Sequence, residues 1–201
     1  MRSFCIAILI CLCSLVQAQT DTSYSIKVHF LYGSKPLRKY KAIEPKYFGG
    51  IHGGHVSIEV DGVDYGFSPK GKFHIIAHKN SRHSTFHGDP GDSTAAHIKG
   101  YKVATIIVPL TAVQYRQISR IHSSYCTAPP YDYAFIGMRC AAASQDVLAQ
   151  IGIVKKRKKA KNVFTTFYPK KLRKRMFMLA KKNHYTIIRQ EGRPTRKWER
   201  D

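Results

Sequence analysis

The dipeptide Asp61-Gly62 constrains the fold of this chain more than any other short segment. It separates two short runs in which apolar and polar residues alternate, His55–Val60 and Val63–Phe67. Asp-Gly favours the tight two-residue turn that joins antiparallel strands, because both residues tolerate positive φ angles. The pattern therefore predicts an antiparallel β-hairpin over residues 55–67.

Other segments have the patterns of further strands and helices. We expect strands over Ser25–Tyr32, Phe73–Ala77, Tyr101–Pro109 and Tyr185–Arg189, and helices over Ala112–Tyr125, Ala141–Ile151 and Lys170–Asn183. Thr111 is a suitable N-cap, Gly152 closes the second helix and Pro169 opens the third. Polar or Gly- and Pro-containing segments are expected to be loops or irregular: Gly33–Gly50, Lys79–Gly100, Lys155–Asn162 and Gly192–Asp201. This order of elements predicts an α+β fold.

The first 18 residues have the features of a secretory signal peptide. Arg2 is followed by the apolar run Phe4–Val16 and by small residues before a cleavage point after Ala18. The apolar run is too short to span a bilayer comfortably. We therefore expect a single domain over residues 19–201 that is exported, either to a periplasm or out of the cell.

The chain is strongly basic, with a formal net charge of +22. Residues 154–201 contain 18 Lys and Arg residues but only three acidic ones. Such a field attracts anionic partners, and for an exported protein these are envelope polymer or a membrane surface. No nucleic acid is expected, because no RNA-recognition or zinc-finger pattern is present. The alternative is a solvated basic face that keeps the protein soluble.

Cys140 is the first candidate for a chemical role. It follows a Gly-containing loop and directly precedes a predicted helix, where the positive end of the helix dipole favours the thiolate. Removal of residues 1–18 leaves Cys126 as the second cysteine, in a Pro-rich connector where nothing activates it. A Cys126–Cys140 disulfide is the alternative in an oxidising compartment.

His55 is the second candidate, because it starts the hairpin directly after Gly53-Gly54. A histidine beside a cysteine supplies the general base that a thiol nucleophile needs. Counting outward from the turn places His55 opposite Ser68, which we expect to accept the hydrogen bond that fixes the imidazole tautomer. His74 is the reserve for this third position, and a purely structural histidine is the alternative for His55.

Other polar groups were weighed for metal, cofactor and oxyanion roles. His83 and His87 have ligand-like spacing, with Asp89, Asp92 and His97 nearby. Gly88 and Pro90 argue against the helix that this spacing needs, so we expect no metal site. No phosphate loop, dinucleotide fingerprint or Gly-x-Ser-x-Gly elbow is present, so we expect no cofactor. Tyr131 and Tyr133 are expected to pack in the interior, or to direct a phenol at an oxyanion.

The segments Gly54–Val60 and Arg139–Gly152, in that order, resemble the permuted branch of the papain-like, NlpC-type superfamily. This branch includes lecithin:retinol acyltransferase-like proteins and many bacterial exported domains, and the resemblance covers about residues 50–152. It implies a papain-like core, in which an antiparallel sheet packs against the helix that bears the cysteine. It also implies that Cys140 is the nucleophile, His55 the general base and Ser68 the third residue, where relatives often have His, Glu or Gln.

The resemblance implies an exported cysteine-dependent hydrolase that cleaves amide bonds of cell-wall peptides through Cys140 and His55. Cys140 N–H is then the expected oxyanion donor. One alternative is a lipid acyltransferase or esterase of the same superfamily. Another is a non-catalytic module with a Cys126–Cys140 disulfide that docks on anionic envelope surfaces.

Overall fold

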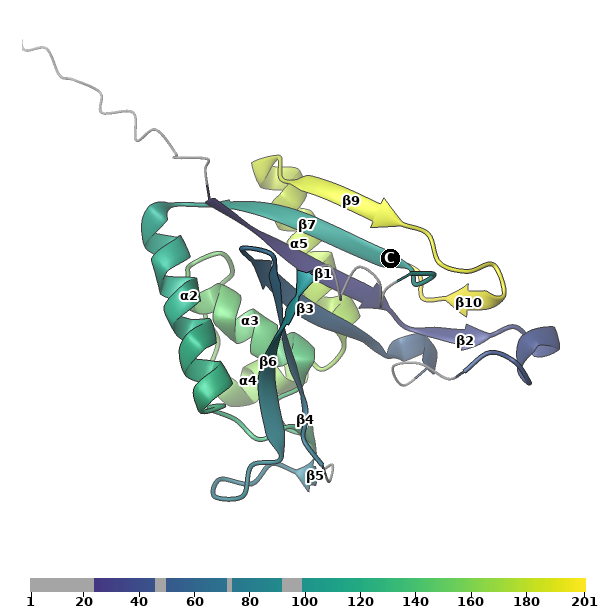
Figure 1. The fold of residues 1–201 in the computed structure, drawn as a ribbon, viewed down its shortest axis with the longest axis horizontal. Helices are drawn as coiled ribbons and strands as arrows, with labels where there is room; N and C mark the ends of the chain where they lie inside the picture. Colours follow the sequence, from purple (N-terminus) through teal and green to yellow (C-terminus); the bar gives the residue numbers. More distant parts are fainter. Residues whose placement is uncertain (1–23, 46–49, 72–73, 92–98) are drawn as a thin grey trace, which may run out of the picture.

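The computed structural model describes residues 24–45, 50–71, 74–91 and 99–201, so the predicted signal peptide lies outside the described residues. A six-stranded antiparallel sheet dominates the fold, with strand order β6-β4-β3-β1-β7-β9 (Figure 1). Its strands are β1 (Tyr24–Tyr32), β3 (Gly54–Val60), β4 (Val63–Pro69), β6 (Ser84–Pro90), β7 (Val103–Leu110) and β9 (Thr186–Gln190). The pairing of β1 with β7 joins segments that are far apart in the sequence.

The predicted hairpin is confirmed. Val60 pairs with Val63 across the turn, and Asp61 and Gly62 have φ angles of 51° and 74°. Two consecutive positive φ angles are what the tight hairpin turn requires, which explains why Asp-Gly occupies it.

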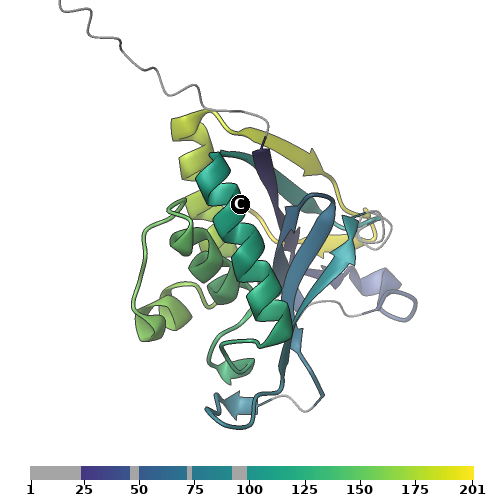
Figure 2. The ribbon, with the colours of Figure 1, turned by 60° about the vertical axis from the view of Figure 1, so that its left-hand side comes forward.

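Four helices cover one face of the sheet (Figure 2). They are α2 (Ala112–Thr127), α3 (Cys140–Gln150), α4 (Lys159–Thr165) and α5 (Pro169–Asn183). The predicted N-cap of α2 is confirmed, because Thr111 and Gln114 form a reciprocal capping box. Gly152 follows α3 with a φ of 76°, a left-handed conformation that ends a helix at little cost for glycine. The predicted α+β class is therefore confirmed.

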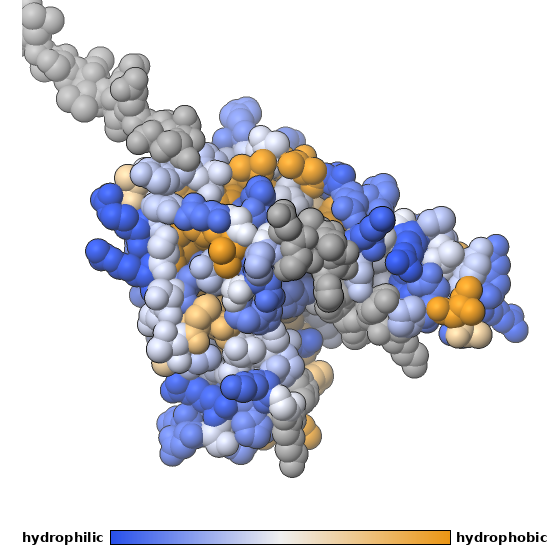
Figure 3. Space-filling view, viewed as in Figure 1, coloured by the Kyte–Doolittle hydropathy of each residue, from blue (hydrophilic) through white to orange (hydrophobic). Residues whose placement is uncertain are grey.

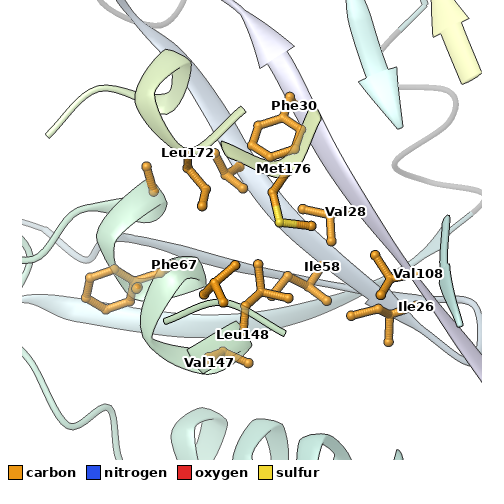
Figure 4. Close-up of a cluster of buried hydrophobic side chains, with 14 of the residues drawn as sticks. Ile26, Val28, Phe30, Ile58, Phe67, Val108, Val147, Leu148, Leu172 and Met176 are labelled. Atoms are coloured by element: carbon orange, nitrogen blue, oxygen red, sulfur yellow. The ribbon is translucent and has the colours of Figure 1, made fainter. Parts of the chain in front are cut away.

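The core lies between this face of the sheet and the helices (Figure 4). Alternate residues of β1 and β3 point into it, and they meet apolar side chains of α3 and α5. The labelled members are Ile26, Val28, Phe30, Ile58, Phe67, Val108, Val147, Leu148, Leu172 and Met176. The intervening residues of β3, among them Ser57 and Glu59, lie on the opposite face.

Two small two-stranded sheets complete the architecture. In one, β2 (Ser34–Pro36) pairs with β10 (Arg196–Trp198), and in the other β5 (His74–Ile76) pairs in parallel with β8 (Ala134–Ile136). A short 3₁₀ helix, η1 (Arg38–Tyr40), lies in the segment predicted as a loop after β1, and a second one, η2 (Gly50–His52), begins at the last residue of that segment. No described helix combines the length and apolar composition needed to cross a membrane.

Besides the Gly33–Gly50 loop, which contains β2 and η1, three further loop predictions were wrong in part. Within Lys79–Gly100, residues 84–90 form β6, because Phe86 is buried in the core while its neighbours face outward. Within Lys155–Asn162, α4 begins at Lys159, because Asn162 is buried and donates a 2.8 Å hydrogen bond to the Ala142 carbonyl.

The third wrong prediction concerns the tail after β9. This segment is held by β10 and by Arg173, which is fully buried and pairs with Glu199 at 2.9 Å and with Asp201 at 3.1 Å. The Arg173 guanidinium also lies over the Tyr32 ring, 3.7 Å from its centroid. Distant charged partners therefore order a tail that has no apolar periodicity of its own.

Hydrophilic side chains gather at the lower end of the molecule, around the segment between β5 and β6 (Figure 3). The same view shows an apolar patch over β9, an edge strand of the sheet in which Ile188 is 53% exposed.

Candidate active site

Cys140 is the first residue of α3, and it is 5% exposed. Arg139 is the N-cap in an extended conformation, and its carbonyl accepts the Ala143 N–H at 2.9 Å. The thiol therefore lies beside the first turn of the helix, where unpaired N–H groups favour a negative charge. This placement agrees with the prediction from sequence.

The sheet opens next to this thiol. The β3–β4 ladder runs from Val60↔Val63 to Ser57↔Gly66, whereas β3 continues to Gly54 with β1 as its ladder partner. Figure 1 shows β4 and β6 extending together toward the lower end of the molecule, away from β1. Because β4 departs, the backbone of β3 ahead of Ser57 is accessible to another element.

Cys140 occupies this opening. Its sulfur accepts a hydrogen bond from the Val56 N–H and is hydrogen-bonded to the His55 imidazole. The structure thus brings together the two residues that the sequence singled out. It adds a backbone donor that the sequence did not indicate.

Gly54 is required immediately before the histidine. Its φ is 103°, and a Cβ at this position would lie 2.3 Å from the Leu31 carbonyl oxygen. Any larger residue would push β3 away from β1 and displace His55.

The charges favour a thiolate–imidazolium pair. Burial raises the pKa of the Cys140 thiol, but the charge and hydrogen bond of His55, the Val56 N–H and Arg139 together lower that pKa below its ordinary value. Burial lowers the pKa of His55, but Cys140 and the Asp64 carboxylate raise it above its ordinary value. The two shifts have the directions expected for a nucleophile and its base.

The surroundings of Ser68 differ from the simplest prediction. The Ser68 hydroxyl lies 3.2 Å from Nδ1 of His87, on the neighbouring strand β6. A Cβ built on Gly66 would lie 3.3 Å from His55 Nε2 and 3.0 Å from His87 Nε2, so both rings flank this glycine. The role of Ser68 in orienting His55 stays a prediction, and the geometry adds His87 as the partner that Ser68 has in the structure.

Asp64 provides the carboxylate of the site. It is buried, and it accepts a 3.0 Å hydrogen bond from the Ser57 hydroxyl. Its other oxygen, Oδ1, is buried without a hydrogen-bond partner among the described residues. An incompletely satisfied buried carboxylate stabilises a nearby imidazolium effectively, because little else screens its charge.

The reserve residue, His74, is engaged elsewhere. Its Nδ1 lies 2.7 Å from Asp132 Oδ2, and its ring stacks on those of His78 and His83. Asp132 also accepts the backbone N–H groups of His78 and His83, at 2.9 Å and 2.8 Å. This buried carboxylate therefore fastens the segment between β5 and β6 to the loop that precedes Cys140.

The two tyrosines have different surroundings. Tyr131 is buried and hydrogen-bonds Asp146 and the Tyr125 hydroxyl, in agreement with a packing role. The Tyr133 hydroxyl accepts hydrogen bonds from the Cys140 N–H and the Arg139 side chain, and burial above all raises its pKa to about 12. Tyr133 thus remains protonated at neutral pH with its hydroxyl beside the thiol.

Both described cysteines are free thiols, Cys126 exposed and Cys140 buried, so the structure does not contain the disulfide of the alternative interpretation. The residues weighed as metal ligands are spread along β6 and the segment before it, with Asp92 and His97 outside the described residues. Within the described part of the chain, no three His, Cys, Asp or Glu side chains form a group able to hold a metal ion.

Sequence reasoning missed Asp64, His87 and Arg139. Strand alternation could have indicated Asp64, because it lies on the same face of β4 as Gly66 and Ser68. His87 could not be placed, because β6 was predicted to be a loop.

No family model matches this chain, and no curated protein or solved structure matches it either.

Proposed function

We propose that this protein is an exported cysteine-dependent hydrolase that cleaves amide bonds through Cys140 and His55. The observation that carries the proposal is the hydrogen bond between these two side chains at the start of α3, with the Val56 N–H on the sulfur. A buried thiol with a lowered pKa and an adjacent imidazole is the arrangement that thiol nucleophiles use.

The reaction would proceed through an acyl-enzyme. His55 holds the proton of the Cys140 thiol, and the thiolate attacks the carbonyl carbon to form a tetrahedral oxyanion. Collapse of this intermediate breaks the C–N bond, and His55 gives its proton to the leaving amine. A water molecule then attacks the thioester, losing its proton to His55. The carboxylic acid leaves, and the thiol is restored.

The oxyanion would be stabilised beside Tyr133. The Tyr133 oxygen accepts hydrogen bonds from the Cys140 N–H and from Arg139, and its hydroxyl is an O–H donor beside the thiol. Acceptance of two donors polarises that O–H and strengthens it as a donor. The Cys140 N–H predicted from sequence would then act through the Tyr133 hydroxyl, or directly on an oxyanion that displaces it.

A permuted papain-like core fits the architecture. The histidine strand precedes the cysteine helix in the chain, and Cys140 begins a helix packed on β3 and β4 of an antiparallel sheet. These observations support the proposal, together with the motifs in residues 54–60 and 139–152.

Cell-wall peptides are the substrate class that we propose first, because they are accessible to an exported hydrolase. One observation favours lipid esters as a second class. Ile76, Phe135 and Ile136, on the β5–β8 sheet just ahead of Cys140, are 65%, 49% and 49% exposed. Exposed apolar side chains beside a nucleophile suit a substrate with an apolar part.

The test is labelling by a thiol-directed acyl probe, followed by turnover assays with muropeptides and with phospholipid vesicles. Cys140→Ala and His55→Ala should each abolish labelling while retaining the circular dichroism spectrum of the wild type. Cys126→Ala is the matched control and should label normally. Normal labelling of Cys140→Ala would refute the proposal, and turnover of lipid alone would reverse the order of the two substrate classes.

A further inference from the structure

A second site lies away from the thiol, where the residues after α3 meet α5. A pocket of about 280 Å³ is found there, and its charged lining residues are Lys155, Arg157, Arg175 and Lys182. No acidic residue is among the residues that line it. Four cations around one small pocket form a strongly positive site.

The side chains of the two arginines are held by hydrogen bonds to two adjacent threonines, Thr165 and Thr166. Arg157 donates from Nη1 to the Thr165 hydroxyl at 2.7 Å. Arg175 donates to the Thr166 hydroxyl at 3.0 Å and to the Thr165 carbonyl at 2.8 Å. Threonines at the end of α4 thus hold two guanidinium groups close together, with neutral acceptors only.

This arrangement leaves the positive charge uncompensated. The ion pairs found among the described residues all use other cations: Lys27, Lys102, Arg173, Arg189, Arg193, Arg196 and three histidines. Burial and then the charge of Arg157 lower the pKa of Arg175, which shows that the two guanidiniums oppose each other electrostatically. Like charges fixed at such proximity are stabilised by an anion placed between them.

Apart from Gln145, the rest of the lining is apolar. Ile153, Val154 and Leu179 contribute to it, and Met178 is 65% exposed at its edge. A ligand that fills the pocket therefore combines an anionic group with a small apolar part.

We propose that this pocket binds a phosphate group carried on a small apolar moiety. Guanidinium groups pair with phosphate oxygens through two parallel hydrogen bonds, and a phosphate monoester carries almost two negative charges near neutral pH. Two arginines flanked by two lysines match that charge better than they match a single carboxylate.

The site is independent of the proposed thiol chemistry. Its only member on α3 is Gln145, which accepts from Arg175 at 3.3 Å and is five residues beyond Cys140. Loss of phosphate binding and loss of acyl chemistry can therefore be measured separately, using Cys140→Ala as a binding-competent protein.

The test is isothermal titration of the full-length protein with phenyl phosphate and with inorganic phosphate, at fixed ionic strength. Wild type should bind phenyl phosphate saturably and more tightly than inorganic phosphate. Arg157→Gln should weaken phenyl phosphate binding about tenfold or more, because a charge-assisted hydrogen bond contributes about 1.5–3 kcal/mol. Arg157→Lys should show a smaller loss, since it keeps the charge without the bidentate geometry.

The matched control is Lys174→Gln, which removes one positive charge from an exposed position on α5 outside the pocket. It should change the Kd by less than about twofold, since exposed charges are screened by salt. An equal loss in Lys174→Gln and Arg157→Gln would overturn the proposal, because diffuse charge would then explain binding. Absence of saturable binding to every phosphate probe would overturn it too.

Vesicles containing phosphatidylglycerol distinguish the two sources of the phosphate. Arg157-dependent binding to vesicles without binding of phenyl phosphate would support the pocket and identify a lipid head group as its ligand. Arg157-dependent binding of phenyl phosphate in solution would support a soluble phosphate ester.

Discussion

Replacement of His55 by alanine should reverse the direction in which the pKa of Cys140 is shifted. In the wild type, the imidazole supplies the two largest effects that lower this pKa from its ordinary 9.0, by its charge and by its hydrogen bond. Without them, burial is opposed only by the Val56 N–H and Arg139, and burial raises the pKa of a thiol. The pKa should therefore move from below 9.0 to above it.

The size of the effect follows from the kind of contact. An opposite charge at hydrogen-bonding distance shifts a pKa by about 1–3 units, and each unit corresponds to about 1.4 kcal/mol. We expect His55→Ala to raise the pKa of Cys140 by about two units. The thiolate fraction at pH 7 would then fall about 100-fold, and the alkylation rate would fall with it, because iodoacetamide reacts with the thiolate.

The assay is the rate of iodoacetamide alkylation from pH 5 to pH 10, followed by peptide mass spectrometry. Trypsin separates the two thiols, because Arg139 lies between Cys126 and Cys140. Cys126, which is exposed on α2, is an internal reference that His55→Ala should not affect. An unchanged midpoint for Cys140, or a parallel shift of both cysteines, would refute the reasoning.

Substitutions of Asp64, Arg173 and Asp132 test three other contacts of the structure. Asp64→Asn removes a carboxylate that raises the pKa of His55, so in the same assay the pKa of Cys140 should rise, by about half a unit to one unit and less than in His55→Ala. Arg173→Met leaves two carboxylates near the end of the chain without their buried partner, and urea unfolding should show a loss of about 3–5 kcal/mol. Although burial raises the pKa of Asp132, its hydrogen bonds to His78 and His83 and its contact with His74 lower that pKa overall. A carboxyl group whose pKa is lowered by folding stabilises the fold at pH values above its pKa in the unfolded chain, and this stabilisation is lost as the pH falls. Urea unfolding should therefore show a free energy of unfolding that declines below about pH 4. The decline should be shallower in Asp132→Asn.

The sequence predicted correctly those structural elements that are determined by residues close to one another in the chain. The hairpin turn depends on Asp61-Gly62 alone, and the start of α2 depends on Thr111 and Gln114, three positions apart. Each signal acts within a few residues, so it survives without knowledge of the rest of the fold.

The elements that sequence analysis missed are stabilised by residues far away in the chain. β6 carries Gly88 and Pro90, which disfavour an interior strand, but it needs to pair only with β4 because it is an edge strand. The segment after β9 is polar throughout, and it is ordered by Arg173, which lies on another element. Neither arrangement leaves a periodic pattern in its own segment.

The same distinction applies to the candidate site. Cys140 and His55 were indicated by what surrounds each of them in the sequence, a helix start and a strand start. The contributions of Asp64 and His87 depend on which strand faces which. The reason for a glycine at position 66 becomes clear only when β6 is known to lie beside β4. The imidazole rings of His55 and His87 then occupy the space that a side chain at this position would need.

The long connections of the sheet determine when Cys140 and His55 come into contact during folding. The contact of His29 with Thr105 spans 76 positions, and that of Tyr32 with Asp201 spans 169. Contacts of such separation form late and make folding slow, whereas the β3–β4 hairpin can close within microseconds. His55 and Cys140 belong to segments that meet only once the sheet has been assembled, so an unfolded chain carries an ordinary, weakly reactive thiol. The alkylation rate of Cys140 therefore also reports on the completion of folding.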